Sequence, residues 1–197
     1  MSFSQLVKIS EDRIGVIIGK NGKVKREIEE KCGVIIDIDS ETGDVVISSK
    51  SSKDLSEMEP FKAIEIVSAI SKGFSPQRAY NLLNEEYSFQ LIDLRSYAGK
   101  SANSIQRIKG RIIGEAGKSR KTIEELSGAF ISVYGHYVGF IGNLEEIKLA
   151  IDAVALLSTG KTHKMVYNIL QEARRKSKID RIRLWEESPT NTDSHRY

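Results

Sequence analysis

The sequence predicts an α+β fold in two tandem units of the same kind, and an internal repeat is the first observation that predicts it. Residues 13–28 (RIGVIIGKNGKVKREI) match residues 108–123 (IKGRIIGEAGKSRKTI) without a gap. A second matching pair, GFSPQRAYNLL (73–83) and GKTHKMVYNIL (160–170), indicates that each unit carries an extra helix after its core. Within each unit, strand-like alternation and helix-like spacing of apolar residues follow one another, as in mixed folds.

The composition is that of a globular protein. The 197 residues are 40% hydrophobic and 29% charged, and the net charge is only +3, so a surface for nucleic acid must come from local clusters of Lys and Arg. The single cysteine, Cys32, excludes an internal disulfide, and its spacing from Val24 and Ile28 predicts a buried helical position. No apolar run approaches the roughly 20 residues of a membrane span and no secretory signal is visible, so we expect a cytoplasmic protein.

The first unit is expected to span residues 3–84, in the order strand, helix, helix, strand, strand, helix. Short apolar runs predict strands at 5–9, 34–39 and 44–48, and helical spacing predicts helices at 11–18, 23–32 and 60–72. Gly33 is a typical helix stop and Pro60 a typical helix start. A polar stretch, 48–57, connects the last strand to the last helix.

The second unit is expected to span residues 85–185, with a flexible tail at 186–197. A strand is predicted at 88–94, and a helix at about 101–108 has no counterpart in the first unit. Gly135 and His136 form a two-residue turn inside a hairpin at 131–141. An amphipathic helix at 143–158 and a basic helix at about 164–178 follow. The cations in and after the basic helix are Arg174, Arg175, Lys176, Lys178, Arg181 and Arg183.

Each copy of the repeat contains Gly-x-x-Gly directly before a helix that opens with basic residues. Two glycines at this spacing let the backbone turn sharply and leave no Cβ in the path of a ligand. The helix that follows directs its free N–H groups and the positive end of its dipole at the same place, which suits a phosphate. The candidate RNA-binding residues are Gly19, Lys20, Asn21, Gly22, Lys23 and Arg26, and then Gly110, Arg111, Ile113, Gly114, Glu115, Ala116, Gly117, Lys118, Arg120 and Lys121.

This pattern resembles the KH family, whose GXXG loop clamps about four nucleotides of single-stranded RNA. The element order resembles type I KH domains, which implies two domains with three-stranded antiparallel sheets, helices on one face of each, and an extra helix after each. Over roughly residues 3–185 the chain resembles the archaeal two-KH-domain proteins of small-ribosomal-subunit RNA processing, which are similar to the eukaryotic partner-of-Nob protein. The resemblance implies binding to the 3′ region of small-subunit ribosomal RNA in ribosome assembly and pre-rRNA processing, beside rRNA-processing enzymes or a translation initiation factor.

The second loop, GEAG, departs from the family pattern because an acid stands where a basic residue is common. In one interpretation, Glu115 points away or contacts a base while Arg111, Lys118 and Arg120 hold the phosphates. In the other, the second unit has turned to protein contacts. We favour RNA contact by both units. A protein-interaction adaptor with weak RNA contact is the alternative function.

The sequence does not favour an enzyme, a cofactor or a metal site. IIGEAGKS (112–119) lacks the first glycine of a phosphate-binding Walker loop, because Ile112 stands there. The acids shared by the two copies, Glu29, Glu30, Glu124 and Glu125, are predicted to lie on solvated helix faces with partners such as Lys25 and Arg120. The basic C-terminal helix fits a solvated face, an extended RNA track or a docking site for a partner. Apolar residues that could line the two clefts, or belong to the cores, are Ile17, Ile18, Ile35, Ile36, Ile112, Ile113, Phe130 and Ile131.

Overall fold

The computed structural model describes residues 3–49, 59–99 and 101–187, and it confirms the two-unit α+β fold. Each unit holds a three-stranded antiparallel sheet, with strand order β1–β3–β2 in the first and β4–β6–β5 in the second. Most of the expected polar stretch, 48–57, and most of the expected tail, 186–197, lie outside the described residues.

The first unit follows the predicted order of elements. Its helix α2 ends where Gly33 takes a left-handed conformation with φ of 66°, and Pro60 opens α3 as predicted. The extra helix is a short α-turn followed by a 3-10 turn, and Ser75 caps it by accepting a hydrogen bond from the N–H of Arg78. The elements are β1 (Ser4–Lys8), α1 (Glu11–Ile18), η1 (Lys20–Gly22), α2 (Lys23–Cys32), β2 (Val34–Ile38), β3 (Asp44–Ser49), α3 (Pro60–Ser71), α4 (Pro76–Ala79) and η2 (Tyr80–Leu83).

The second unit repeats this order with three differences. A short helix, α5, comes before α6, the helix that precedes the loop. α6 is longer than predicted and continues up to the loop. The basic C-terminal helix, α9, is longer than predicted at both ends. Asn143 and Glu146 form a reciprocal capping box at the start of α8. The elements are β4 (Ser88–Asp93), α5 (Arg95–Ala98), α6 (Ala102–Ile113), η3 (Glu115–Gly117), α7 (Lys118–Ser127), β5 (Phe130–Tyr134), β6 (Tyr137–Gly142), α8 (Leu144–Ser158) and α9 (His163–Glu187).

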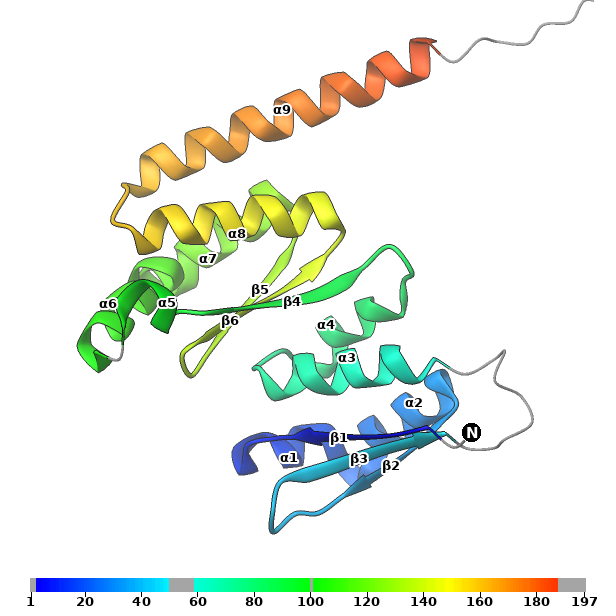
Figure 1. The fold of residues 1–197 in the computed structure, drawn as a ribbon. Coiled ribbons are helices and arrows are strands. Elements are labelled where there is room, and N and C mark those ends of the chain that lie inside the picture. Colours follow the sequence, from blue (N-terminus) through cyan, green and yellow to red (C-terminus); the bar gives the residue numbers. More distant parts are fainter. Residues whose placement is uncertain (1–2, 50–58, 100, 188–197) are drawn as a thin grey trace, which may run out of the picture.

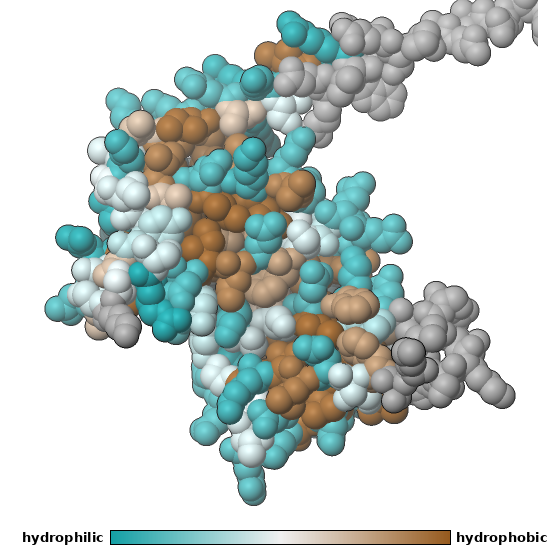
Figure 2. Space-filling view, in the orientation of Figure 1, coloured by the Kyte–Doolittle hydropathy of each residue, from teal (hydrophilic) through white to brown (hydrophobic). Residues whose placement is uncertain are grey.

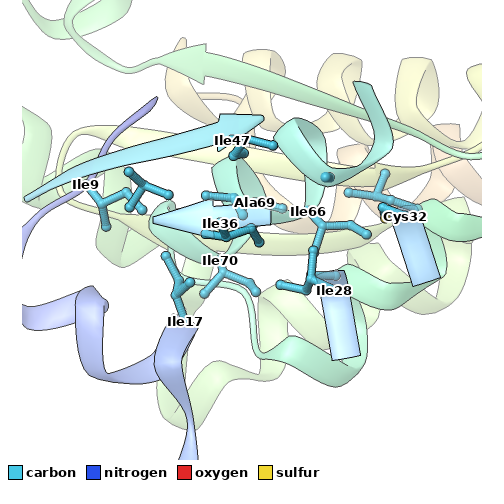
Figure 3. Close-up of a cluster of buried hydrophobic side chains, with 14 of the residues drawn as sticks. Ile9, Ile17, Ile28, Cys32, Ile36, Ile47, Ile66, Ala69 and Ile70 are labelled. Atoms are coloured by element: carbon cyan, nitrogen blue, oxygen red, sulfur yellow. The ribbon is translucent and has the colours of Figure 1, made fainter. Parts of the chain in front are cut away.

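Each unit has its own hydrophobic core between its sheet and its helices. In the first unit Ile17, Ile28 and Ile36 meet Ile66 of α3 (Figure 3). Cys32 is fully buried there, as predicted, and burial raises the pKa of its thiol to about 11.

The cores settle which apolar residues are able to line a cleft. Four of the eight candidates are fully buried in the cores: Ile17, Ile36, Ile112 and Ile131. Ile35 and Phe130 alternate with the buried strand residues and so lie on the opposite face of each sheet. Ile18 and Ile113 are the two that stay partly exposed next to the loops.

The two units form one stack. Figure 1 shows the layers in the order first sheet, first helices, second sheet, second helices and α9. The face of the second sheet that its own helices leave open packs on the segment 72–83 of the first unit. There the rings of Phe74 and Phe89 meet edge to face at 6.2 Å, and Ile141 belongs to the first core. Gly139 makes this approach possible, because a Cβ at that position would lie 2.9 Å from the ring of Phe74.

Candidate nucleic-acid interface

The two GXXG loops have the same backbone conformation although their side chains differ. Gly19 has φ of 69° and ψ of 177°, and Gly114 has 71° and 179°. Asn21 and Ala116, two positions later, are both left-handed, with φ of 56° and 50°. Asparagine tolerates this conformation, whereas alanine pays roughly 1–2 kcal/mol for it. Backbone strain of this kind is characteristic of functional loops and is maintained by the structure around it.

The two glycines of each loop have different steric roles. A Cβ on Gly19 would lie 2.4 Å from Cγ2 of Val24, and a Cβ on Gly114 would lie 2.8 Å from the backbone nitrogen of Ser119. The first glycine therefore lets the helix approach the loop closely. A Cβ on Gly22 or Gly117 would meet nothing within 4 Å. The second glycine thus faces open space, where a ligand has room.

The helix after each loop starts without a side-chain cap among the residues that the structure describes. The N–H groups of its first turn and the positive end of its dipole therefore remain directed at the loop. Lys20, Lys23 and Lys118 are exposed beside these helix starts. Lys23 pairs with Glu27 at 3.7 Å, an exposed i,i+4 pair that holds the lysine weakly. Both loops offer a site for an anion.

Arg26 supports the first loop from behind. Its Nη2 donates to the carbonyl of Asn21 at 2.8 Å and its Nε to that of Gly22 at 3.4 Å. The guanidinium of Arg26 therefore holds the left-handed part of the loop. Lys121 occupies the same position in the second unit and is exposed. Gly110, also predicted as a site residue, is exposed on α6.

Arg111 has different partners from those expected. Its Nε donates to the carbonyl of Leu157 at 3.0 Å, and its Nη2 donates to that of Lys161, so the side chain closes the C-terminal end of α8. Arg13 does the same in the first unit, donating to the carbonyl of Ile70 at 2.9 Å. These two arginines occupy different positions in the ungapped alignment, which is why the sequence did not pair them. Two nitrogens of the Arg111 guanidinium thus have backbone carbonyls as partners.

An acid in the helix after each loop holds the edge strand. Glu29 Oε1 accepts the backbone N–H of Ile36 at 2.9 Å, and Glu124 Oε1 accepts that of Ile131 at 2.7 Å. The prediction that these two acids lie on solvated helix faces is therefore wrong. Their neighbours, Glu30 and Glu125, are exposed as predicted.

The predicted i,i+4 pairs are found in one copy. Lys25 and Glu29 lie 3.9 Å apart. In the second unit Glu124 instead binds Arg78 of the first unit, with Nη1 to Oε1 at 2.6 Å. Arg120 extends toward the strand, with its Nη1 3.5 Å from the carbonyl of Ile131. The sequence did not identify Arg78, although it lies in the second matching segment, because its partner comes from the other unit.

In each unit the helix after the loop lies beside the edge strand of the sheet. β2 and β5 are edge strands. The N–H groups of Ile36 and Ile131 point outward to the acids, so Ile38 and Val133, two residues later, direct their backbone groups to the same side. Each unit thus combines an anion site at its loop with the backbone donors and acceptors of a strand edge. This arrangement suits a single strand of nucleic acid, whose phosphates and base edges both need partners.

Other kinds of site find no support in the part of the chain that the structure describes. No three His, Cys, Asp or Glu side chains gather there as they would around a metal ion. None of the helices in residues 3–49, 59–99 and 101–187 has the length and apolarity needed to span a bilayer.

Family models match both units. Residues 4–57 match the model of the KH domain, and residues 88–175 match a model described as the eukaryotic type KH-domain, type I. A KH domain-containing protein of Methanocaldococcus jannaschii is 42% identical over 92% of this chain and 78% of its own length. The pre-rRNA-processing protein pno1 of Schizosaccharomyces pombe is 30% identical over 66% of this chain and 54% of its own length. The chain thus spans about half the length of that eukaryotic relative.

Two solved structures have the same fold over nearly the whole chain. A protein of unknown function from Aeropyrum pernix matches with a TM-score of 0.87 and 36% identity, and the match covers 95% of this chain and 100% of the Aeropyrum chain. The second is the complex of a/eIF2alpha, aDim2p and rRNA from Pyrococcus horikoshii. Its matching chain has a TM-score of 0.82 and 43% identity, over 89% of this chain and 96% of that one.

Proposed function

This chain belongs to the archaeal family of two-KH-domain proteins related to Pno1 and Dim2, and from this premise we propose that it binds single-stranded RNA through both of its GXXG loops. The observation that carries the proposal is a loop conformation built twice from different side chains, each time beside an open strand edge. Each loop holds the backbone of about four nucleotides, and the bases turn toward β2 or β5. The role is binding, without catalysis.

In the first unit the phosphates meet the loop itself and two exposed lysines. Arg26 acts on the RNA through the loop that it supports. The residues that contact RNA there are Gly19, Lys20, Asn21, Gly22 and Lys23.

In the second unit Arg120 extends toward the edge strand and adds a cation near it. Glu115 is exposed and opposes phosphate, so the electrostatic part of binding is weaker at this loop. The residues that contact RNA there are Ile113, Gly114, Glu115, Ala116, Gly117, Lys118, Arg120 and Lys121.

The RNA that we propose is the 3′ region of small-subunit ribosomal RNA, bound during ribosome assembly and pre-rRNA processing. The names of the relatives support this choice, since one is a pre-rRNA-processing protein and another is seen in a complex with rRNA. That complex also contains a/eIF2alpha, which supports a translation factor, beside rRNA-processing enzymes, as a partner of this chain.

A fluorescence-anisotropy titration tests the proposal. Three probes are compared: a single strand from the 3′ end of small-subunit rRNA, a scrambled strand of the same composition, and the first strand annealed to its complement. We expect the 3′ strand to bind at least about tenfold more tightly than either control, and its affinity to fall steeply as salt rises.

Each control has its own meaning. Equal binding of the scrambled strand would rule out the proposed rRNA target, and equal binding of the duplex would rule out the single-stranded mode. If none of the three probes binds above the level of an unrelated basic protein, the adaptor function becomes the better account. That function is favoured by the protein factor in the relative's complex.

A further inference from the structure

The joint between the two units serves as a template for a contact that this chain can make with another copy of itself. We call residues 72–83 the first tail, and they pack on the open face of the second sheet. Lys72 places its ammonium 4.7 Å from the ring centroid of Tyr137, and its carbonyl accepts a hydrogen bond from the hydroxyl of Ser132 at 3.0 Å. Arg78 stacks on the ring of Phe130 at 5.3 Å. Apolar and polar contacts thus alternate across the joint.

The corresponding segment of the second unit, residues 159–170, is the second tail, and the backbone of its residues 159–166 repeats hydrogen bonds of residues 72–79. The matching pairs of hydrogen bonds are Gly73 N to Ile70 O and Gly160 N to Leu157 O, both 3.1 Å; Phe74 N to Ala69 O at 3.2 Å and Lys161 N to Leu156 O at 3.0 Å; and Arg78 N to Ser75 Oγ and Met165 N to Thr162 Oγ1, both 3.4 Å. The second tail therefore has the shape of the first over residues 159–166. Beyond them it continues as the α-helix α9, whereas the first tail ends in the 3-10 turn η2.

The second tail is uncovered in the single chain. Met165 is 44% exposed and Ile169 is 39% exposed, whereas Val166 and Leu170 on the inner side of the helix are buried. A shallow hollow of about 320 Å³ lies on this surface, bounded by Met165, Asn168 and Ile169 among others.

The open face of the first sheet is uncovered as well, and we call it the head. Leu6 is 57% exposed and Ile35 is 45% exposed. In the strand register Val46 lies opposite Leu6, and Ile35 lies opposite Ser48, two residues further along β3. Figure 2 shows brown, hydrophobic surface over the first unit. The equivalent face of the second sheet is the one that the first tail covers. In Figure 1 the first sheet therefore lies at one end of the stack, and α9, which begins in the second tail, lies at the other end.

We propose that the second tail of one molecule docks on the head of another, as the first tail docks on the second sheet. On the head, Ile35 occupies the position of Phe130, and in the second tail Met165 occupies the position of Arg78. The contact between Ile35 and Met165 is therefore apolar, where the internal joint has a cation–aromatic pair. Asp37 and Asp44 take the places of Ser132 and Tyr137 in the register. The second tail brings an exposed lysine, Lys161, to the place of Phe74, over Val46, which is the register partner of Asp37. The two surfaces are thus complementary in both apolar character and charge.

Such a contact is heterologous, because each molecule uses a different surface on its two sides. It does not close on itself as a symmetric dimer does, so association continues into rows. On the head, Val46 occupies the position that Gly139 has in the second sheet, so the space that Phe74 fills there is absent. In the second tail, Lys161 occupies the position of Phe74. The contact is therefore weaker than the internal joint, and we expect it in the high-micromolar range. This inference does not depend on the proposed function.

Sedimentation equilibrium over a concentration series tests the proposal, with three variants of the full chain. Ile35→Asp damages the head and leaves the tail intact, and Met165→Asp does the reverse. Leu144→Asp changes an exposed leucine of α8 that belongs to neither surface and is 71% exposed, so it is the matched control. Circular dichroism and thermal melting establish that each variant is folded.

The expected pattern is specific to a head-to-tail contact. The weight-average mass of the wild type and of Leu144→Asp rises beyond that of a dimer, while Ile35→Asp and Met165→Asp each stay monomeric. An equimolar mixture of these two variants forms dimers that do not grow, since one intact head meets one intact tail. A wild type that stays monomeric at every concentration overturns the proposal, and so does a mixture without dimers, self-association of either single variant, or loss of association in Leu144→Asp.

Discussion

Glu29 and Glu124 each connect the helix after a loop to the edge strand of the same unit. A carboxylate oxygen in the second half of the helix accepts the backbone N–H of a strand residue, at 2.9 Å from Ile36 and 2.7 Å from Ile131. In the second unit the same carboxylate also holds Arg78 from the first unit. The side chain of Glu124 is nearly buried, so this network is protected from solvent. A charge-assisted hydrogen bond in such a place contributes more than an exposed ion pair does.

We predict that Glu124→Ala destabilises the protein more than Glu29→Ala does. The first change leaves both a strand N–H and the guanidinium of Arg78 without their acceptor, and the second leaves mainly the N–H. The expected losses in the free energy of unfolding are about 2–3 kcal/mol and about 1–2 kcal/mol. Urea titrations followed by far-UV circular dichroism measure both. Equal losses would show that Arg78 adds nothing to the network.

Cys32 gives the protein a defined response to alkaline pH. Burial raises the pKa of its thiol from 9.0 to about 11. Between these values the unfolded chain releases a proton that the folded chain keeps, so the free energy of unfolding falls as pH rises. The contribution of this group is fully present below pH 9.0, and its loss approaches about 1.4 kcal/mol per pH unit above it.

The variant Cys32→Ala isolates this contribution. Burial also raises the pKa of Tyr80, so the wild-type curve contains a second alkaline component that the variant retains. Cys32→Ala is less stable than wild type at every pH because the substitution leaves a cavity. In urea titrations between pH 8 and 11, we expect its free energy of unfolding to fall less steeply with pH than that of wild type. Parallel curves would mean that the thiol is not buried as described.

At the scale of elements, each loop and the helix after it form one module with two kinds of glycine. Alanine at Gly22 or Gly117 has room and pays only for its positive φ, roughly 1–2 kcal/mol. Alanine at Gly19 or Gly114 pays this and also collides with the following helix. We therefore predict losses of about 3 kcal/mol for Gly19→Ala and Gly114→Ala.

The collision differs between the two modules. At Gly114 the nearest obstacle includes the backbone of Ser119, which cannot turn away, so this variant should lose most. Thermal melting of the four alanine variants gives the ranking. If Gly22→Ala melts as low as Gly19→Ala, the close approach of helix and loop does not explain the first glycine.

The sequence predicted the elements well where local patterns decide them. Gly33, Pro60 and the turn at Gly135 all lie where the sequence placed an end, a start and a hairpin. It could not predict the partners of Arg111 or Arg78, because each depends on a segment about fifty positions away in the chain. Helix lengths were also missed at the C-terminal end, where α9 continues to Glu187 through a run of charged residues without a stop signal.

At the scale of the molecule, a hydrogen bond across the joint connects the helix before the first loop to the second sheet. The hydroxyl of Tyr134, at the end of β5, donates to the carboxylate of Asp12 at 2.6 Å. This hydrogen bond is the main cause that lowers the pKa of Asp12. Asp12 lies on α1, the helix that leads into the first loop, and β5 is the edge strand of the second sheet.

The central claim is that the loops themselves hold the phosphates, and four variants test it directly in one filter-binding titration with short single-stranded RNA. Gly22→Asp and Gly117→Asp add a carboxylate at each open glycine, and Gly22→Asn and Gly117→Asn add a neutral group of the same size that tolerates the same backbone. We expect each Asp variant to weaken binding about tenfold or more, and each Asn variant by no more than about threefold. If the Asp and Asn variants bind alike, at wild-type strength, RNA does not lie on these loops.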